Sequence, residues 1–275
     1  MRDKTAAVRR PALAGLFAAV LVSATPCAQA WEPPAGASAH EILIGARKDA
    51  DEGRFAVAAE KHLWFHEHVL ERDPAMSGVR MSFALSAWAS LAHRHAPAMT
   101  QLLAVRDQAL ARIDAGGRPG QQALGEVIHI NNYLGGQSES TRDAFKRLAD
   151  RDPVLAERDV LDALPALIQL NEFELASQHL RVDAVVGRVE SLYKLIQEHP
   201  PSKLSASERA EMLRSQQRVI DVQLARVVLV LGKERRDAEA EQVLARGRAL
   251  LGPEASVHHM TQALRGITPP DDRDG

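Results

Sequence analysis

Residues 206–231 read ASERAEMLRSQQRVIDVQLARVVLVL. Apolar side chains recur there at three- and four-residue spacing, which places them on one face of a helix. The members of this face are Leu213, Ile220, Leu224, Val227 and Leu231. The last turn, residues 227–231, is apolar on every side, which indicates burial by several neighbours. Ser205 and Glu208 form the Ser-x-x-Glu capping box of a helix start. The stretch therefore predicts a long helix packed inside a larger helical array.

The same helical periodicity continues on both sides of this stretch, from residue 39 to residue 267. Alanine, leucine, glutamate and arginine dominate, and all four favour helices. Glycine and proline mark the breaks between helices, and the clearest of them are Gly53, Pro74, Pro97, Gly135-Gly136, Pro153, Pro200-Pro201 and Gly252-Pro253. We expect an all-α fold, built either as a stack of antiparallel helix pairs or as a closed helical bundle.

The chain divides into four segments by composition. We predict a secretory signal peptide over 1–30, a short proline- and glycine-bearing linker over 31–38, a helical repeat-like domain over 39–267 and a disordered tail over 268–275. In segment 1–30, basic residues precede an apolar run over 12–24, and the small-x-small cleavage sequence Ala28-Gln29-Ala30 follows the run. The run is shorter than the ~18 residues of a membrane-spanning helix. We therefore expect cleavage near Ala30, a periplasmic or secreted product and no integral membrane segment in it.

The single cysteine, Cys27, falls inside the predicted signal peptide, so the mature chain has no disulfide and no thiol. The alternative is that Cys27 carries a lipid and tethers an envelope lipoprotein. Segment 1–30 holds four of the 34 basic residues and one of the 36 acidic ones, which leaves 30 basic and 35 acidic residues after cleavage. A chain without a basic excess is not expected to bind nucleic acid or an anionic membrane surface.

Residues 50–74 contain a glycine and an aromatic residue at a turn (Gly53, Phe55), small residues at a helix contact (Ala58, Ala59) and a closing Asp73-Pro74. This pattern resembles the second half of a tetratricopeptide repeat in a degenerate form, about one helical turn longer than the family's ~34-residue period. Residues 232–253 resemble the same half-repeat, and residues 61–67 resemble a stretch of exported bacterial repeat proteins. The resemblance implies a right-handed stack of helix pairs, a tetratricopeptide-like α-solenoid, with a concave surface for peptides or protein segments.

The expected helix over 121–134 is rich in uncharged polar side chains. We interpret one face of it as partner-binding, because carboxamides are adaptable donors and acceptors for a bound peptide backbone. The residues assigned to this face are Gln122, Glu126, His129 and Asn132. The competing interpretation is an ordinary solvated helix side that ends at Gly135.

His62 and His66 are the one pair with the spacing of metal ligands on a helix face. The chain departs from the His-Glu-x-x-His pattern of zinc proteases, because Leu70 stands where the second histidine belongs. A metal site would need a third ligand from another helix, such as His93 or His95. The competing interpretation, which we prefer, is that His62 and His66 are polar edges of a packed helix, so no metal and no other cofactor is expected.

No phosphate-binding loop, nucleophile elbow or dinucleotide motif occurs in the sequence, and we assign no catalytic residue. The sequence therefore favours a non-enzymatic protein-interaction scaffold of the bacterial envelope, with a protein or peptide partner in a concave helical groove. Two alternatives stay open: a metal-dependent hydrolase centred on His62 and His66, and a lipoprotein anchored through Cys27.

Overall fold

Every regular element in the part of the chain that the computed structural model describes, residues 31–198 and 204–270, is helical, which confirms the predicted all-α class. The predicted signal peptide, with Cys27, lies outside the described residues, as does segment 271–275 of the predicted tail. The described residues belong to one compact unit. None of their helices has both the length and the apolar content needed to cross a membrane.

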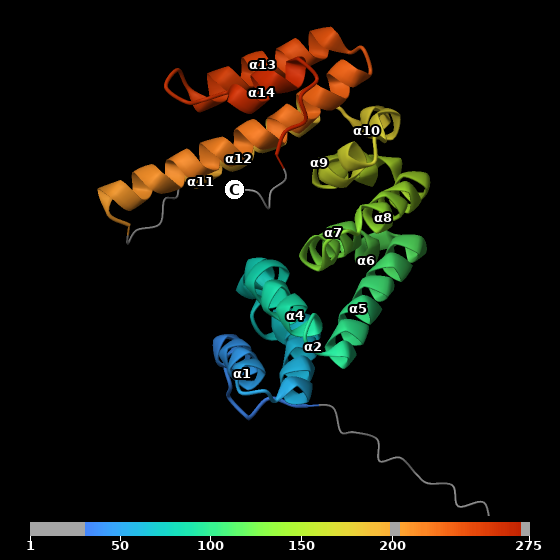
Figure 1. Ribbon diagram of the computed structural model, residues 1–275, viewed down its shortest axis with the longest axis vertical. Helices are drawn as coiled ribbons and strands as arrows, with labels where there is room; N and C mark the ends of the chain where they lie inside the picture. Colours follow the sequence, from blue (N-terminus) through green and yellow to red (C-terminus); the bar gives the residue numbers. More distant parts are fainter. Residues whose placement is uncertain (1–30, 199–203, 271–275) are drawn as a thin grey trace, which may run out of the picture. The chain divides into compact units, whose positions relative to one another are not determined.

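Twelve helices of seven or more residues fall within the described ranges, and short helical turns join some of them (Figure 1). The first part contains α1 (Ala39–Asp51), α2 (Phe55–Arg72), η1 (Pro74–Met76), α3 (Ser77–Val79), η2 (Arg80–Ala84), α4 (Leu85–Ala92), α5 (Ala96–Ala115), α6 (Gly117–Gly120) and α7 (Ala123–Leu134). The second part contains α8 (Ser138–Arg151), α9 (Pro153–Gln169), α10 (Phe173–His179), α11 (Val182–Glu198), α12 (Ala206–Lys233), α13 (Asp237–Leu251) and α14 (His258–Leu264).

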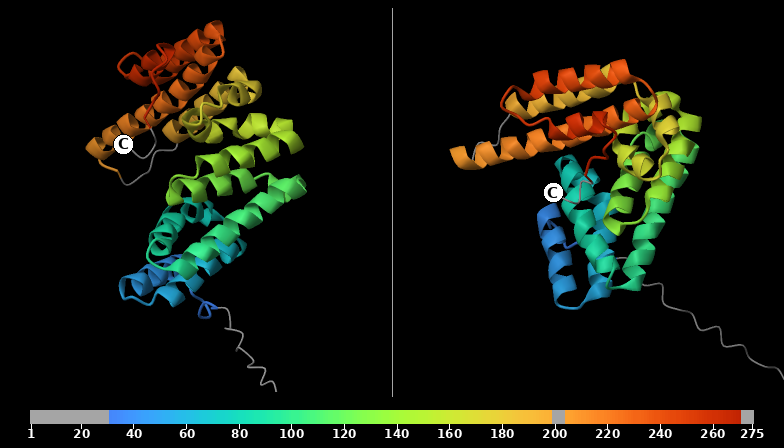
Figure 2. Two further views of the ribbon diagram at one scale, coloured as in Figure 1. Left: turned by 45° about the vertical axis from the view of Figure 1, so that its right-hand side comes forward. Right: turned by 45° about the horizontal axis from the view of Figure 1, so that its top comes forward.

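Helices that follow one another in the chain pack against each other. The main pairs are α1 with α2, α8 with α9, and α12 with both α13 and α14 (Figures 1 and 2). Between them, α5 packs on α4, α7 and α8, while α12 returns to contact α9 and α10. Short turns join α1 to α2, α8 to α9 and α12 to α13, so the members of these three pairs run antiparallel, whereas α14 follows α13 in the chain. The described part is thus a series of sequential helix pairs.

The helix boundaries follow the local signals in the sequence. Ser205 accepts a hydrogen bond from the Glu208 backbone N–H, and the Glu208 carboxylate accepts from the Ser205 N–H, so the predicted capping box is confirmed. The helix it begins continues to Lys233, two residues beyond the predicted end. Gly135 follows the last residue of α7 and has a φ of 71°. A positive φ ends a helix, and glycine adopts it without strain.

The core confirms that the last turn of the 206–231 stretch is buried on all sides, since residues 227–231 are each at most 1% exposed. This turn belongs to the largest apolar cluster, which joins α5 and α7 to α13 and includes Phe145 and Leu164. A separate cluster around Trp88 joins α2, α4 and α5. Trp64, Phe65 and Trp88 are core residues, whereas Phe83 is 66% exposed.

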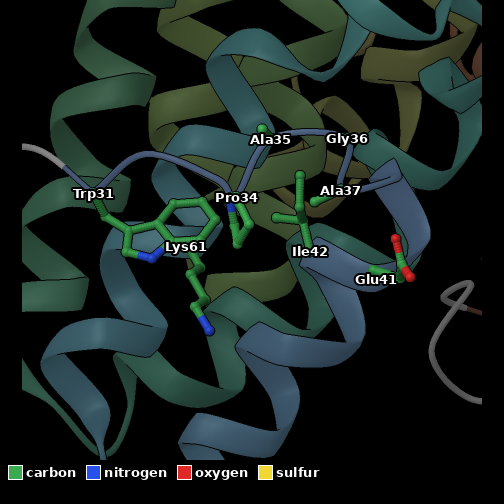
Figure 3. A pocket seen from close by; sticks show the side chains of 8 residues that line it. All are labelled: Trp31, Pro34, Ala35, Gly36, Ala37, Glu41, Ile42 and Lys61. Atoms are coloured by element: carbon green, nitrogen blue, oxygen red, sulfur yellow. The ribbon is translucent and has the colours of Figure 1, made fainter.

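The segment predicted as a linker packs against the first helix pair. Trp31 meets Trp64 of α2 edge to face, with ring centres 6.0 Å apart, and Lys61 Nζ lies 5.4 Å from the Trp31 ring centre. Figure 3 shows residues 34–37 passing over the start of α1, and the Trp31 ring beside Lys61. Near the other end of the described residues, the Pro270 carbonyl accepts a hydrogen bond from Arg226 Nη2 at 3.1 Å.

Gly247 of α13 permits the close approach of α14 and α12. A Cβ atom at this position would lie 2.7 Å from Met260 Cε and 3.2 Å from Leu224 Cδ1. We expect Gly247→Val to lower the free energy of unfolding by about 2 kcal/mol, because it overfills a packed core. Gly187→Ala is the matched change on α11, where a Cβ would meet nothing within 4 Å. Gly187→Ala should raise the free energy of unfolding by about 0.5–1 kcal/mol through helix propensity alone. Urea denaturation measures both values, and equal effects would contradict this account.

Candidate functional site

One face of α7, together with Gln122 directly before the helix, carries all four residues that the sequence assigned to partner binding. Gln122, Glu126, His129 and Asn132 are spaced by four, three and three residues, so they follow one line along the helix. Gln122, His129 and Asn132 are exposed to solvent, whereas Glu126 is 7% exposed. The structure therefore brings the predicted residues together, but with Glu126 beneath the surface that the other three form.

Two neighbouring cavities lie beside this face of α7. One, of about 290 Å³, lies between α2, α5 and α7. The other, of about 250 Å³, lies between α7, α9 and residues 77–81. The side chains of Leu70, Arg80, Gln122 and Glu126 line both cavities. We call the two cavities together the α7 groove.

The two long walls of the second cavity, α7 and α9, run parallel. Gln122 of α7 lines it with Arg158 of α9, and His129 lines it with Asp162. Further along, Asn132 shares a small third cavity with Gln169. Residue numbers thus rise in the same direction on both helices, while α8 returns between them and packs on each. This arrangement places equivalent faces of two helices side by side.

Glu126 lies at the base of the α7 groove and holds three surrounding elements. Its Oε1 lies 3.0 Å from His66 Nε2 and 3.0 Å from Arg112 Nη2, and its Oε2 lies 3.2 Å from Arg80 Nη2. Burial by itself raises the pKa of the Glu126 carboxyl, but the His66 hydrogen bond and the two guanidinium groups outweigh it and lower that pKa to about 2. The carboxylate is therefore ionised and fully engaged, so it supports the groove from below.

The α9 side of the groove presents ionisable groups that are less constrained. Arg158 binds Asp159 through two hydrogen bonds, of 2.6 and 2.7 Å. Asp162 and His129 are accessible to solvent and have no hydrogen bond or ion pair among the described residues. Burial among the groove walls and the neighbouring Asp159 carboxylate raise the pKa of Asp162, and burial lowers the pKa of His129. Both groups can therefore exchange hydrogen bonds with a bound molecule.

Sequence reasoning missed the residues that η2, α5 and α9 contribute, namely Arg80, Gln108, Arg112, Arg158 and Asp162. Each stands on an element other than α7. Nothing in the local sequence separates these side chains from the many other arginines, glutamines and aspartates on exposed helix faces. Only the packing of helix pairs brings them to the row on α7.

The His62–His66 pair is part of the core around Trp88. His62 is 2% exposed and stacks on the Trp88 ring, with ring centres 6.3 Å apart and an angle of 7° between the planes. His66 is 4% exposed and meets the same ring at 5.8 Å. Both imidazoles are thus more deeply buried than polar edges of a helix would be. Of the candidate third ligands, His93 is exposed and His95 lies against Phe55. Within residues 31–198 and 204–270, no three His, Cys, Asp or Glu side chains are placed to hold a metal ion.

Two other cavities lie outside the α7 groove. The cavity of about 410 Å³ beside Trp31 contains two charged groups, and both are engaged (Figure 3). Lys61 pairs with Asp49 at 2.6 Å, and Glu41 accepts hydrogen bonds from Ser38. In the cavity of about 490 Å³ between α12 and α14, Asp221 accepts hydrogen bonds from the backbone N–H groups at the start of α14. Lys61, Glu41 and Asp221 are thus engaged within the fold, whereas Gln122, His129 and Asp162 of the α7 groove are accessible.

We expect Glu126→Ala to lower the free energy of unfolding by about 3 kcal/mol, because His66, Arg80 and Arg112 then lose their shared carboxylate partner. Glu241 of α13 is exposed and has no ion pair among the described residues, so Glu241→Ala should change stability by less than about 0.5 kcal/mol. Chemical denaturation at pH 7 measures both. A loss below about 1 kcal/mol for Glu126→Ala would show that the carboxylate does not hold these elements.

Burial, with a smaller effect of the Arg47 charge, lowers the pKa of His62 to about 4 from the usual 6.5. Between pH 6.5 and pH 4, His62 therefore binds a proton in the unfolded chain but not in the folded chain. The contribution of His62 to the free energy of unfolding is complete above pH 6.5 and is lost as the pH falls towards 4. In His62→Phe the ring remains and the proton uptake disappears. Between pH 8 and pH 5 the variant should lose about 2 kcal/mol less stability than the unchanged chain. Urea denaturation across this range tests it, and identical pH profiles would refute it.

Comparison of the chain with protein-family models, curated proteins and solved structures returns no match. The tetratricopeptide resemblance of residues 50–74 is therefore not accompanied by a match to a family model. What the structure establishes is that the described part of the chain is all-helical and consists of sequential helix pairs, with a polar groove along α7. The function has to be inferred from this groove and its chemistry.

Proposed function

We propose that the protein is a non-enzymatic interaction scaffold that binds an extended segment of a partner protein in the α7 groove. The observation that carries the proposal is the row of accessible polar side chains along α7, which faces a second polar helix across the cavities. Carboxamides and a neutral imidazole can both donate and accept hydrogen bonds, as the backbone of an extended peptide requires.

The length of the row suits a short peptide segment. Gln122 and Asn132 are ten residues apart, which corresponds to about 15 Å along a helix at 1.5 Å per residue. An extended chain advances about 3.3 Å per residue, so four to five residues of a partner would follow the row. That is a typical length for recognition of a linear segment.

The base of the groove is held together by ion pairs, which favours a preformed binding site. Glu126 links α2, η2 and α5 to α7 through His66, Arg80 and Arg112. A preformed groove does not have to be ordered when the partner binds, so less of the interaction energy is lost to conformational entropy. The accessible groups, Gln122, His129 and Asp162, stand above this base and would make the contacts.

The helix arrangement supports an open stack of pairs as the architecture behind the groove. The parallel alignment of α7 and α9, with α8 antiparallel between them, is the relation expected of equivalent helices in neighbouring repeats. A tetratricopeptide-like α-solenoid is therefore our proposal for the fold in its finer detail. The sequence of segment 1–30 supports export, so we propose a partner in the bacterial envelope or outside the cell.

A display library of random peptides tests the groove directly, with the purified full-length chain as the target. Enriched peptides should bind with micromolar affinity, and Gln122→Trp should weaken them at least about tenfold by filling the groove. Gln242→Trp is the matched control, because Gln242 is an exposed glutamine on α13 far from the row in sequence. It should change the affinity less than about twofold. Peptides that bind both variants as tightly as the unchanged chain would refute the groove as the binding site.

A further inference from the structure

The cavity of about 250 Å³ between α7 and α9 contains one charge that no other lining residue balances. Five charged side chains line this cavity. Arg80 pairs with Glu126 at 3.2 Å, and Arg158 binds Asp159 through hydrogen bonds of 2.6 and 2.7 Å. The fifth, Asp162, is exposed to solvent and has no hydrogen bond or ion pair among the described residues. A molecule that enters the cavity therefore meets an accessible, unpaired carboxylate.

Neutral hydrogen-bonding groups line the same cavity. Ser77, Gln122 and His129 are exposed, and none of their side chains has a hydrogen bond among the described residues. Burial lowers the pKa of His129, so its ring is neutral and one ring nitrogen can accept a hydrogen bond. The hydroxyl oxygen of Ser77 and the amide oxygen of Gln122 are acceptors as well. Together with Asp162, these groups suit a ligand that carries several N–H donors.

Part of the lining is apolar. Leu70 of α2 and Met81 of η2 line the cavity, and both side chains are partly exposed. The flexible thioether of methionine adapts its shape to the molecule that packs on it. Lysine and arginine side chains combine a methylene stem, which packs on apolar surface, with a charged group, which needs a polar partner. A cavity with an apolar wall and an accessible carboxylate matches both halves of such a side chain.

The positive charges near this cavity weaken its attraction for a cation without abolishing it. Burial and the Asp159 carboxylate raise the pKa of Asp162, and the charge of Arg188 on α11 opposes them. Arg188 is exposed, so water and salt screen its charge. Arg112 lines the neighbouring cavity, where it pairs with Glu126 at 3.0 Å. Removal of the Arg188 charge should therefore strengthen the binding of a cation at Asp162.

We propose that this cavity binds the side chain of a lysine or arginine residue of the partner segment, with the charged group at Asp162 and the methylene stem on Leu70 and Met81. This inference deepens the proposed function and rests on it. His129 belongs to the row on α7 and lines the cavity together with Asp162, so a segment that follows the row passes this carboxylate. The charged group is either the ammonium group of lysine or the guanidinium group of arginine.

Small probes test the cavity without any partner. NMR of the full-length chain follows the ring signals of His129 and the backbone signal of Asp162 during each titration. The probes are butylammonium for lysine and propylguanidinium for arginine, each with a neutral analogue of similar shape, butan-1-ol and propylurea. We expect a cation to bind saturably and about tenfold more tightly than its neutral analogue, because a hydrogen bond to an ionised partner is the stronger one. The cation with the larger ratio identifies the residue type.

Three variants assign the binding to Asp162. Asp162→Asn keeps the shape of the side chain and should weaken cation binding about tenfold. Asp150→Asn is the matched control, since Asp150 is exposed on α8 and has no ion pair among the described residues, and it should change the affinity less than about twofold. Arg188→Gln should strengthen cation binding about threefold.

The Asp162→Asn variant should remain folded. Burial and Asp159 disfavour the charge of Asp162 in the folded chain, so the neutral side chain should leave the protein at least as stable as before. Thermal unfolding measures this. An affinity gain in Arg188→Gln gives a second test that a damaged fold cannot imitate.

The outcomes separate this inference from the proposed function. Equal affinities for a cation and its neutral analogue, or an unchanged cation affinity in Asp162→Asn, overturn the inference. Groove peptides from the display library should be enriched in lysine or arginine and should lose about tenfold in affinity with Asp162→Asn. Groove peptides without a basic residue overturn the inference and leave the proposed function standing. Cation probes that bind at Asp162 while the library yields no groove peptide support the cavity as a cation site and count against the proposed function instead.

Discussion

The buried ion cluster around Glu126 is the interaction on which the rest of the site depends. One carboxylate on α7 meets cationic or imidazole groups from three other elements: His66 of α2, Arg80 of η2 and Arg112 of α5. A charge is stable in such a place only when partners replace the water that it has lost. The cluster therefore fixes where these elements lie relative to α7, and the two cavities of the groove form on either side of it.

The polar character of the groove follows from the same constraint. With the charge of Glu126 balanced below, the accessible positions of α7 are free to carry neutral groups such as Gln122, His129 and Asn132. The cavity at Asn131 continues this chemistry with hydroxyls and carboxamides alone. Neutral donors and acceptors favour an extended peptide over a highly charged ligand, because they pair with amide groups without a cost for burying charge. The accessible carboxyl on the α9 wall is that of Asp162.

The histidines of α2 show how packing determines the role of a residue type. His62 and His66 have the spacing of metal ligands, yet both rings lie against one indole, that of Trp88. His66 Nε2 forms a hydrogen bond with Glu126 Oε1, and burial lowers the pKa of both imidazoles. Neutral, buried rings of this kind serve the core and the base of the groove. Their position also makes the stability of this region sensitive to acid.

The sequence by itself determined the helical class, most helix boundaries and the polar row on α7. These features depend on short-range physics: the 3.6-residue period, the capping box at Ser205 and the left-handed glycine at position 135. Only the tertiary structure decided that Glu126 is buried, that Asp162 and Arg158 face the row, and that Asn131 has a free acceptor. These facts depend on which helices become neighbours, because the residues involved lie on different helices and meet only through tertiary packing.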